Sequence, residues 1–297
     1  MSDSTESLRR KIGTAGDLQS VVRTMKAVAA SSIGQYESAV RALDDYFRTV
    51  QLGLVACLRP TPAADTAMPA PAQDRGAIGA IVFGSDQGLV GQFNEAMMSF
   101  VLKTLAPMPG KKTVWTVGER LQAQLIETEL PPGESFALPG SIRAIAPLVG
   151  QLLMALEAQR EKGAISQVYL FHHQPTAGAI YSPVCQRLLP LDAAWQRELT
   201  VIAWPTANLP EVMNHPAQTL RAFIREYLFV SLFRACAQSL ASENASRLAA
   251  MQRAEQNIDD LLEDLNLSFH RLRQSGIDEE LFDVISGFEA LGDAAAR

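Results

Sequence analysis

The sequence predicts an α/β protein in which two long terminal helices pair as an antiparallel coiled coil around an inserted α/β domain. Two observations lead to this fold class. Apolar residues recur three and four positions apart over long stretches at both ends of the chain, and short apolar runs alternate with helical patterns between them. The first pattern is typical of a narrow seam between helices, and the second of a mainly parallel sheet covered by helices.

The C-terminal helix is indicated by an apolar stripe between Arg247 and Leu291. Its members, spaced to lie on one helix face, are Leu248, Met251, Ala254, Ile258, Leu261, Leu265, Phe269 and Leu272. Charged residues occupy the other faces, so the stripe requires a partner helix rather than a broad core. The segment Ser275–Leu281 allows either a second helix start capped by Asp278 or one continuous helix through Gly276, and continuity is favoured.

The partner helix is predicted at the N-terminus, where Ser4 or Ser7 is placed to cap it. Apolar steps from Val22 onward alternate mostly between three and four, close to a 3.5-residue repeat. These positions are Met25, Ala29, Ile33, Tyr36, Val40, Leu43, Phe47, Val50 and Leu54, preceded by Leu8, Ile12 and Leu18. The helix therefore spans about 50 residues, or about 75 Å. An ordinary helical bundle is the alternative, although nothing between the two helices supplies further bundle members.

Four segments are predicted from these patterns. Residues 1–58 form the N-terminal coiled-coil helix, residues 59–75 a proline- and alanine-rich linker, residues 76–205 the α/β domain, and residues 209–292 the C-terminal coiled-coil helix. The two long helices thus flank an insertion, which places the chain's two ends in the same coiled coil.

The middle segment is expected to be Rossmann-like. Strands are predicted at AIGAIVFG, KTVWTVG and QVYLFHHQ, and SPVCQRLLPL is predicted as an edge strand because its prolines cannot donate to a neighbour. Helices are predicted at FNEAMMSFVLKTL, ERLQAQLIE and IRAIAPLVGQLLMALEAQREKG. The last helix is expected to break or kink at Pro147 and to end near Gly163.

Composition excludes several classes of protein. The chain is 47% hydrophobic and 20% charged, a balance typical of soluble globular proteins, and its net charge of −6 argues against broad affinity for nucleic acid. Cys57, Cys185 and Cys236 are odd in number and scattered, which predicts reduced thiols in a cytosolic compartment. The first residues lack the apolar region of a secretory signal, and no apolar run is long enough to suggest a membrane span.

Motifs for chemistry are few. The stretch Gly84–Asn94, GSDQGLVGQFN, follows a strand as a phosphate-binding turn would, but it lacks the following lysine, so a tight strand-to-helix turn is favoured. His172 and His173 are adjacent on a strand and must point to opposite faces, which argues against a shared metal site. No set of nucleophile, base and oxyanion donors can be assembled. The sequence therefore predicts no catalytic residue, no cofactor and no metal.

Arg273 and Gln274 are candidates for binding a partner. Their planar donor fork and amide suit a loop of another protein, and ordinary solvated side chains are the alternative.

Three motifs in the same order resemble those of the gamma subunit of F-type ATP synthases. The C-terminal match comprises Ser242, Glu243, Arg247, Ala250, Met251, Ala254, Asn257, Arg273, Gln274, Ile277, Glu280, Leu281, Ile285, Gly287, Ala290 and Leu291. The N-terminal match comprises Met25, Lys26, Val28, Ala29 and Ala30, and GSDQGLVGQFN is similar to the family's TSDRGLCGGYN. The sequence differs from the family's motifs at Gln87, Val90, Gln92, His270 and Asp278. They indicate a divergent bacterial member, and membership of a second ion-pumping ATPase type stays open.

The resemblance implies a central-stalk rotor shaft that couples transmembrane ion flow to ATP synthesis or hydrolysis without being an enzyme itself. The implied partners are the alpha and beta subunits of the catalytic ring, the epsilon subunit and the membrane rotor ring of c subunits. Met25 and Lys26 would lie near a lever of the beta subunits, Arg273 and Gln274 would grip a beta loop, and the segment from Phe288 to Ala296 would turn in an apolar bearing. The implied location is peripheral, on the cytoplasmic face of the bacterial inner membrane.

Two other functions are weighed against this one. A coiled-coil scaffold or adaptor with an α/β binding domain would share the fold, and the proteins that co-purify with the chain would distinguish it. A small nucleotide-using α/β enzyme with coiled-coil arms would instead bind nucleotide through residues 74–205.

Overall fold

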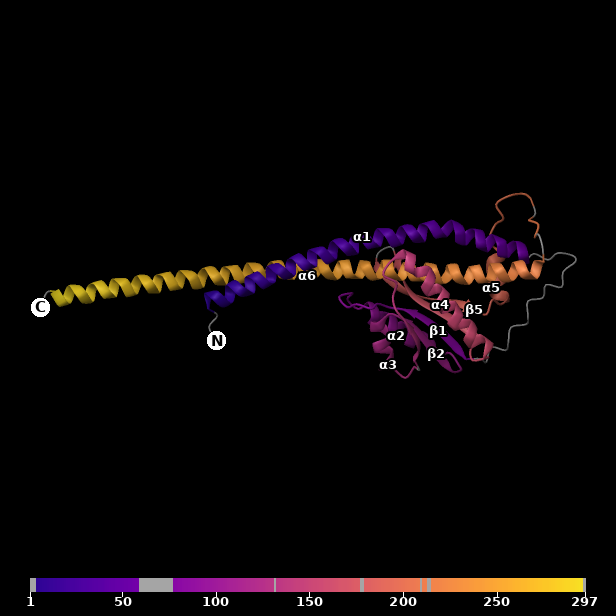
Figure 1. Cartoon of the computed structure of the whole chain (residues 1–297), viewed down its shortest axis with the longest axis horizontal. Coiled ribbons are helices and arrows are strands. Elements are labelled where there is room, and N and C mark those ends of the chain that lie inside the picture. Colours follow the sequence, from indigo (N-terminus) through magenta and orange to yellow (C-terminus); the bar gives the residue numbers. More distant parts are fainter. Residues whose placement is uncertain are drawn as a thin grey trace. The chain divides into compact units, whose positions relative to one another are not determined.

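The computed structural model describes residues 4–58, 77–130, 132–176, 179–208, 210–212 and 215–295 (Figure 1). The predicted linker, 59–75, lies outside these residues. The elements are α1 (Thr5–Leu58), β1 (Ile78–Phe83), α2 (Phe93–Leu105), β2 (Lys112–Val117), α3 (Glu119–Ile126), β3 (Pro132–Phe136), α4 (Ile142–Glu161), β4 (Gln167–Thr176), β5 (Ala179–Leu189), α5 (Ala193–Thr200) and α6 (Pro216–Ala295).

The chain divides into two compact units, and the two long helices contribute to both. One unit contains residues 1–28 and 248–297, and the other contains residues 29–247. These units are defined by contacts within the folded chain, and their boundaries differ from those of the four segments predicted from the sequence. The four segments therefore remain a proposal about domain organisation.

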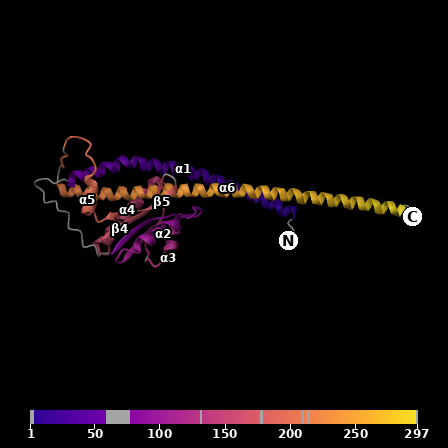
Figure 2. The same ribbon diagram turned by 180° about the vertical axis from the view of Figure 1, so that it is seen from behind.

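In the first unit, α1 and α6 form the predicted antiparallel pair (Figure 1, Figure 2). Gln19 donates a hydrogen bond to Asp259, and Arg23 donates to Glu255, so partner numbers on α6 fall as numbers on α1 rise. Leu8, Ala15 and Met251 are buried in the seam. The apolar stripes read from the sequence are therefore the contact faces of the two helices.

Helix α6 runs without interruption through Gly276, as predicted. It extends past the start of α1 within this unit (Figure 1), and every residue from 273 to 286 is exposed. Among the described residues, this stretch lacks a helix to cover it.

The second unit contains a five-stranded sheet with the order β3-β2-β1-β4-β5. Strands β1, β2, β3 and β4 are parallel, and β5 is an antiparallel edge strand paired with β4. The three predicted strands and the predicted edge strand are all present. Strand β3 was missed because PGESF has no apolar run, and α5 was missed because it is only eight residues long.

The sheet has a hydrophobic core on each face because its side chains alternate. Ala80 and Val82 of β1 face a cluster that includes residues of α2 and α3. Ile81 and Phe83 face the other cluster, which contains residues of α4 and of α1 and α6. The coiled coil of this unit is thus one layer of the sheet's own core.

Local signals for helix ends are mostly confirmed. The Ser7 backbone N–H donates to Ser4 Oγ at 3.2 Å, so Ser4 caps α1, and Gly163 ends α4 with a φ of 66°. Of the two outcomes predicted at Pro147, the break is wrong, because α4 continues through this residue, and the kink stays a prediction. Apolar side chains on both sides of the proline are buried, and this packing offsets the lost backbone hydrogen bond.

Candidate partner-binding site

The predicted contact residues near the start of the chain lie on the coiled coil and are already engaged there. Lys26 and Met25 are half-buried, and the Lys26 ammonium donates a hydrogen bond to Glu255 Oε2. Arg23 Nε donates to Glu255 Oε1 at 3.0 Å. The Lys26 and Arg23 hydrogen bonds hold the pKa of the Glu255 carboxyl below its usual value. Glu255 was missed from the sequence, because its role depends on the register between two helices.

Arg273 and Gln274 occupy a different part of the surface. Both are exposed on the stretch of α6 that continues past α1. Arg273 follows Glu255 by about 18 residues, or about 27 Å along a helix, so the structure does not bring the two predicted pairs together. The two predicted pairs therefore lie at separate places on the coiled coil rather than in one site.

A group of large, exposed apolar side chains follows Arg273 and Gln274 on the same helix. We define the C-terminal apolar patch as five exposed residues of this helix: Ile277, Leu281, Phe282, Val284 and Ile285. Phe282 is 67% exposed. Clustered apolar exposure of this kind marks a surface that contacts another protein. The segment predicted to turn in a bearing, 288–296, has no described side chains.

The glycine-rich stretch after β1 is a loop whose conformation is fixed by hydrogen bonds of its own polar side chains. The Ser85 N–H donates to Asn94 Oδ1 at 3.0 Å, and Asn94 Nδ2 donates to Ser85 Oγ at 2.8 Å. The Asp86 carboxylate accepts from the N–H of Glu119 at 2.9 Å and of Leu138 at 3.1 Å. These groups organise the loop and the start of α3, which supports the predicted strand-to-helix turn rather than a phosphate cradle.

Helix α6 contacts this loop through a second set of groups. Ser246 Oγ donates to the backbone carbonyl of Val90 at 2.5 Å. Arg247 pairs with Glu243 at 2.6 Å, and both side chains are largely buried. Burial raises the pKa of the Glu243 carboxyl, although the Arg247 charge acts in the opposite direction. The Ser246 bond fastens the loop after β1 to α6, and the Arg247–Glu243 pair lies beside it on the same helix.

The adjacent histidines point to opposite faces of the sheet, as predicted. His172 Nε2 is hydrogen-bonded to Gln238 on α6 at 2.9 Å, and His173 Nε2 to the carbonyl of Phe93 at 2.9 Å. Burial lowers the pKa of each imidazole to about 4. Among the described residues, no cluster of three or more His, Cys, Asp or Glu could hold a metal ion.

The three cysteines are thiols at separate places in the second unit, and burial raises the pKa of Cys185 to about 11. In the described part of the chain, no helix has the length and apolar character needed to cross a membrane.

The fold defines a class of protein: a two-helix coiled coil with an inserted α/β domain and an exposed apolar patch on its longer helix. A family model described as ATP synthase matches residues 4–291, and the chain belongs to this family. The resemblance seen in the sequence is confirmed by this match.

Relatives described as ATP synthase gamma chains align with this chain along nearly their whole length. The ATP synthase gamma chain of Polynucleobacter necessarius subsp. necessarius (strain STIR1) is 24% identical over 300 residues, covering 97% of this chain and 99% of the relative. The ATP synthase gamma chain of Granulibacter bethesdensis (strain ATCC BAA-1260 / CGDNIH1) is 28% identical over 302 residues, covering 97% and 99%.

Solved structures share the fold. One chain in the structure of the Euglena gracilis mitochondrial ATP synthase rotor aligns with a TM-score of 0.65 at 14% identity, covering 92% of this chain and 98% of that one. The central stalk and c-ring structure of the Tetrahymena thermophila mitochondrial ATP synthase contains a chain that aligns with a TM-score of 0.56 at 21% identity, covering 79% and 99%.

Proposed function

We propose that this chain is the central-stalk gamma subunit, the rotor shaft, of an F-type ATP synthase. In this role it couples transmembrane ion flow to ATP synthesis or hydrolysis. The observation that carries the proposal is the family match from residue 4 to 291, which spans both long helices and the sheet. The exposed continuation of α6 past α1 supports it, because a shaft needs surface left for the subunits around it.

The hydrogen bonds between distant segments of the chain suit a shaft that transmits force. Within the first unit, charged and amide side chains link α1 to α6 at Arg23, Lys26 and Gln19. Within the second unit, Ser246 and the loop at Val90 fasten the sheet to α6. Each link joins residues more than a hundred positions apart in sequence. Such links resist sliding of one helix or sheet past another, as turning under load requires.

The proposed partners follow from the family and from these surfaces. The first unit contacts the alpha and beta subunits of the catalytic ring, and the sheet contacts the epsilon subunit and the ring of c subunits. Arg273 and Gln274 are exposed and donate to a beta loop. Met25 and Lys26 lie against a beta lever, with Glu255 holding the Lys26 ammonium in position. The C-terminal apolar patch packs inside the ring.

The chain itself is not catalytic, and it works as a peripheral subunit on the cytoplasmic face of a bacterial inner membrane. Ser85, Asp86 and Asn94 of the Gly84–Asn94 stretch are hydrogen-bonded within the protein, which supports a structural role for this loop.

The test is affinity purification of the tagged full chain from its own cells. We expect recovery with six large nucleotide-binding subunits, ATPase activity in that complex, and no turnover by the chain alone. Met251→Asp places a charge in the coil seam and should abolish recovery of the complex. The matched control is Met154→Asp, since Met251 is 2% exposed and Met154 is 72% exposed. Turnover by the chain alone, or recovery with unrelated proteins only, contradicts the proposal.

A further inference from the structure

Four large apolar side chains on the coiled coil of the first unit are exposed. Leu18, Val21 and Val28 belong to α1 and Leu261 to α6, and each is 49% to 60% exposed. The sequence predicts Leu18 and Leu261 as members of the apolar stripes, but the structure places them beside the seam rather than in it. The spacing of the buried residues gives the reason.

The seam alternates between steps of four and three residues on both helices. Its buried and half-buried members are Leu8, Ile12, Ala15, Gln19, Val22 and Lys26 on α1, and Met251, Glu255, Ile258, Leu262, Leu265, Phe269 and Leu272 on α6. These are the a and d positions of a heptad, in which a step of three leads from a to d and a step of four from d to a. Leu18 and Met25 each precede an a position of α1 by one residue, and Leu261 does so on α6, so all three occupy g positions.

The two sides of the seam differ in chemistry. In an antiparallel pair, a two-fold axis across the coil relates the helices, so the g positions of both helices lie on one side and the e positions on the other. Arg23 and Asp259 follow d positions and are therefore e positions. Arg23 donates a hydrogen bond to Glu255, and Gln19 donates one to Asp259, so these polar contacts between the helices lie on the e side.

The g side is apolar. Leu18, Val21, Met25 and Val28 follow one another at steps of three and four, so they form one stripe along α1. Moving four residues along α1 from one e-side bond to the other moves four residues back along α6, so position 260 is level with Leu18, and Leu261 lies next to it on the g side. We call these five residues the lateral stripe. It extends over about 15 Å and includes no charged residue.

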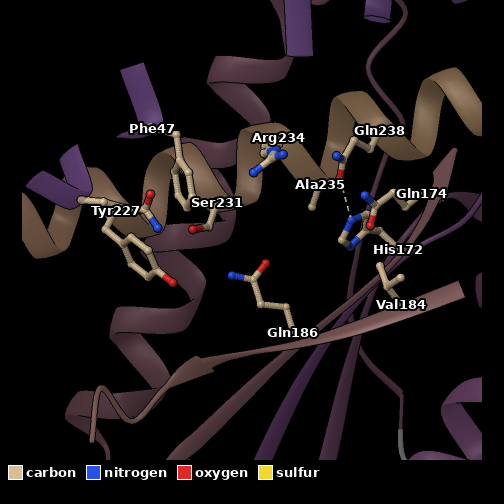
Figure 3. A pocket seen from close by; sticks show the side chains of 11 residues that line it. Phe47, His172, Gln174, Val184, Gln186, Tyr227, Ser231, Arg234, Ala235 and Gln238 are labelled. Atoms are coloured by element: carbon tan, nitrogen blue, oxygen red, sulfur yellow. Dashed lines mark hydrogen bonds between the residues drawn. The ribbon is translucent and has the colours of Figure 1, made fainter. Parts of the chain in front are cut away.

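Farther along α1, in the second unit, a large side chain of the same helix is covered within the chain. The Phe47 ring stacks with Tyr227 at 5.7 Å between centroids, and the Arg234 guanidinium carbon lies 5.5 Å from the Phe47 centroid (Figure 3). Among the described residues, nothing covers the lateral stripe in this way, because its members on α1 other than Met25 are more than half exposed. Apolar groups that are exposed together on one face mark a surface for another protein.

We propose that the lateral stripe is the surface of the coil that the lever of the beta subunits contacts, and that the lever meets it with apolar side chains. This inference rests on the proposed function, which supplies the beta subunits as neighbours. Met25 connects the stripe to that contact, because it is the member that the family resemblance assigns to the lever. The stripe carries no charge, so a charged lever group placed on it would lose water without gaining a partner.

Lys26 belongs to the seam instead. It occupies an a position, and its ammonium is hydrogen-bonded to Glu255. The Glu255 carboxylate also accepts from Arg23, so both cations are engaged within the coil. Of the two residues assigned to the lever, Met25 therefore makes the contact, and Lys26 holds α1 against α6.

Substitutions at two neighbouring exposed positions test the proposal in the complex purified with the tagged chain. Val21→Asp places a charge on the lateral stripe and should reduce ATP-driven ion pumping at least about tenfold, because the lever would have to desolvate that charge. Ser20→Asp is the matched control at a b position, toward the e side, and should pump nearly as the unmodified complex does. Both side chains are exposed, so thermal unfolding of the isolated chain should be similar for the two variants.

The sign of the charge distinguishes an apolar contact from an electrostatic one. Val21→Lys should impair pumping as strongly as Val21→Asp, and Val21→Ile should retain it. Opposite effects of the two charges would show that the lever contact is electrostatic and overturn the proposal, and full pumping by both charged variants would overturn it as well.

A photo-crosslinking residue identifies the occupant of the stripe. Benzoylphenylalanine in place of Val28 should form adducts with the beta subunit, whereas in place of Ala27, an exposed b position, it should form few. Adducts at Val28 with another subunit instead of beta contradict the proposed occupant. Recovery of the complex with the unmodified chain is measured first. Absence of the six large nucleotide-binding subunits there refutes the proposed function, whereas an intact complex without beta adducts at Val28 refutes the lateral stripe alone.

Discussion

The Ser246 hydroxyl on α6 donates a hydrogen bond to the backbone carbonyl of Val90, 2.5 Å away, across 156 positions of sequence. Both residues are buried, with exposed fractions of 4% and 3%. Val90 lies in the loop between β1 and α2, so this bond fastens the carboxyl end of the central strand to the long helix.

Ser246→Ala should lower the free energy of unfolding by about 1–3 kcal/mol, because it leaves the Val90 carbonyl buried and unpaired. Chemical denaturation measures the change. Ser268→Ala removes an exposed hydroxyl from the same helix and should change stability by less than about 0.5 kcal/mol. Equal effects of the two substitutions would show that the bond to Val90 contributes nothing specific.

Two glycines should respond to alanine in opposite directions. Gly118 has a φ of 120°, and an added Cβ would meet the backbone of Ser85 at 2.8 Å, so Gly118→Ala should cost about 3 kcal/mol. Gly150 lies inside α4 with nothing within 4 Å of an added Cβ, so Gly150→Ala should stabilise by roughly 0.5–1 kcal/mol. Thermal unfolding of both variants tests this, and a neutral Gly118→Ala would contradict the close approach to Ser85.

The buried histidines predict acid sensitivity. Burial lowers the pKa of His172 and His173 to about 4, below the ordinary value of 6.5 that they regain on unfolding. Between these values the unfolded chain binds more protons, so the contribution to stability is complete above pH 6.5 and is lost as pH falls toward 4. Each histidine accounts for about 3 kcal/mol over that range.

The unfolding free energy should fall less steeply between pH 6.5 and 4 in His172→Gln than in the unmodified chain. The difference in slope should correspond to up to one proton taken up on unfolding, and denaturation at several pH values measures it. Curves that stay parallel for the two chains would mean that His172 is already protonated in the folded state.

Arg273→Ala tests the proposed contact with the beta subunits. The side chain is exposed, so folding should not change, while loss of a charge-assisted donor should weaken binding to the ring roughly tenfold and reduce ATP-driven ion pumping. Arg271→Ala, two residues away and also exposed, should pump almost as well as the unmodified complex. Full pumping by Arg273→Ala would remove this residue from the proposed contact.

Much of the fold could be read from local patterns. The stripes on both long helices, the three parallel strands with apolar runs and the edge strand all follow from spacing that is visible within one segment. Strand β3 could not be found, because PGESF has neither alternation nor an apolar run and is held by its pairing with β2. The break predicted at Pro147 failed because packing of the surrounding helix outweighed the local preference.

The candidate sites divide in the same way. Arg273 and Gln274 were visible as donors on a polar helix face, and the structure confirms that they are exposed. Glu255 and Ser246 were not visible, because a carboxylate or a hydroxyl on a helix surface looks the same in sequence whether or not a distant group meets it.

The sequence by itself determined that this chain forms two long helices, that they pair, and that a strand–helix domain lies between them, since periodicity is a local property of the chain. Only the tertiary structure decided which polar groups are already used. The Lys26 ammonium is hydrogen-bonded to Glu255, the Val90 carbonyl to Ser246, and His172 Nε2 to Gln238. The physical reason is register: these contacts depend on how far one helix is displaced along its neighbours, and no single segment encodes that displacement.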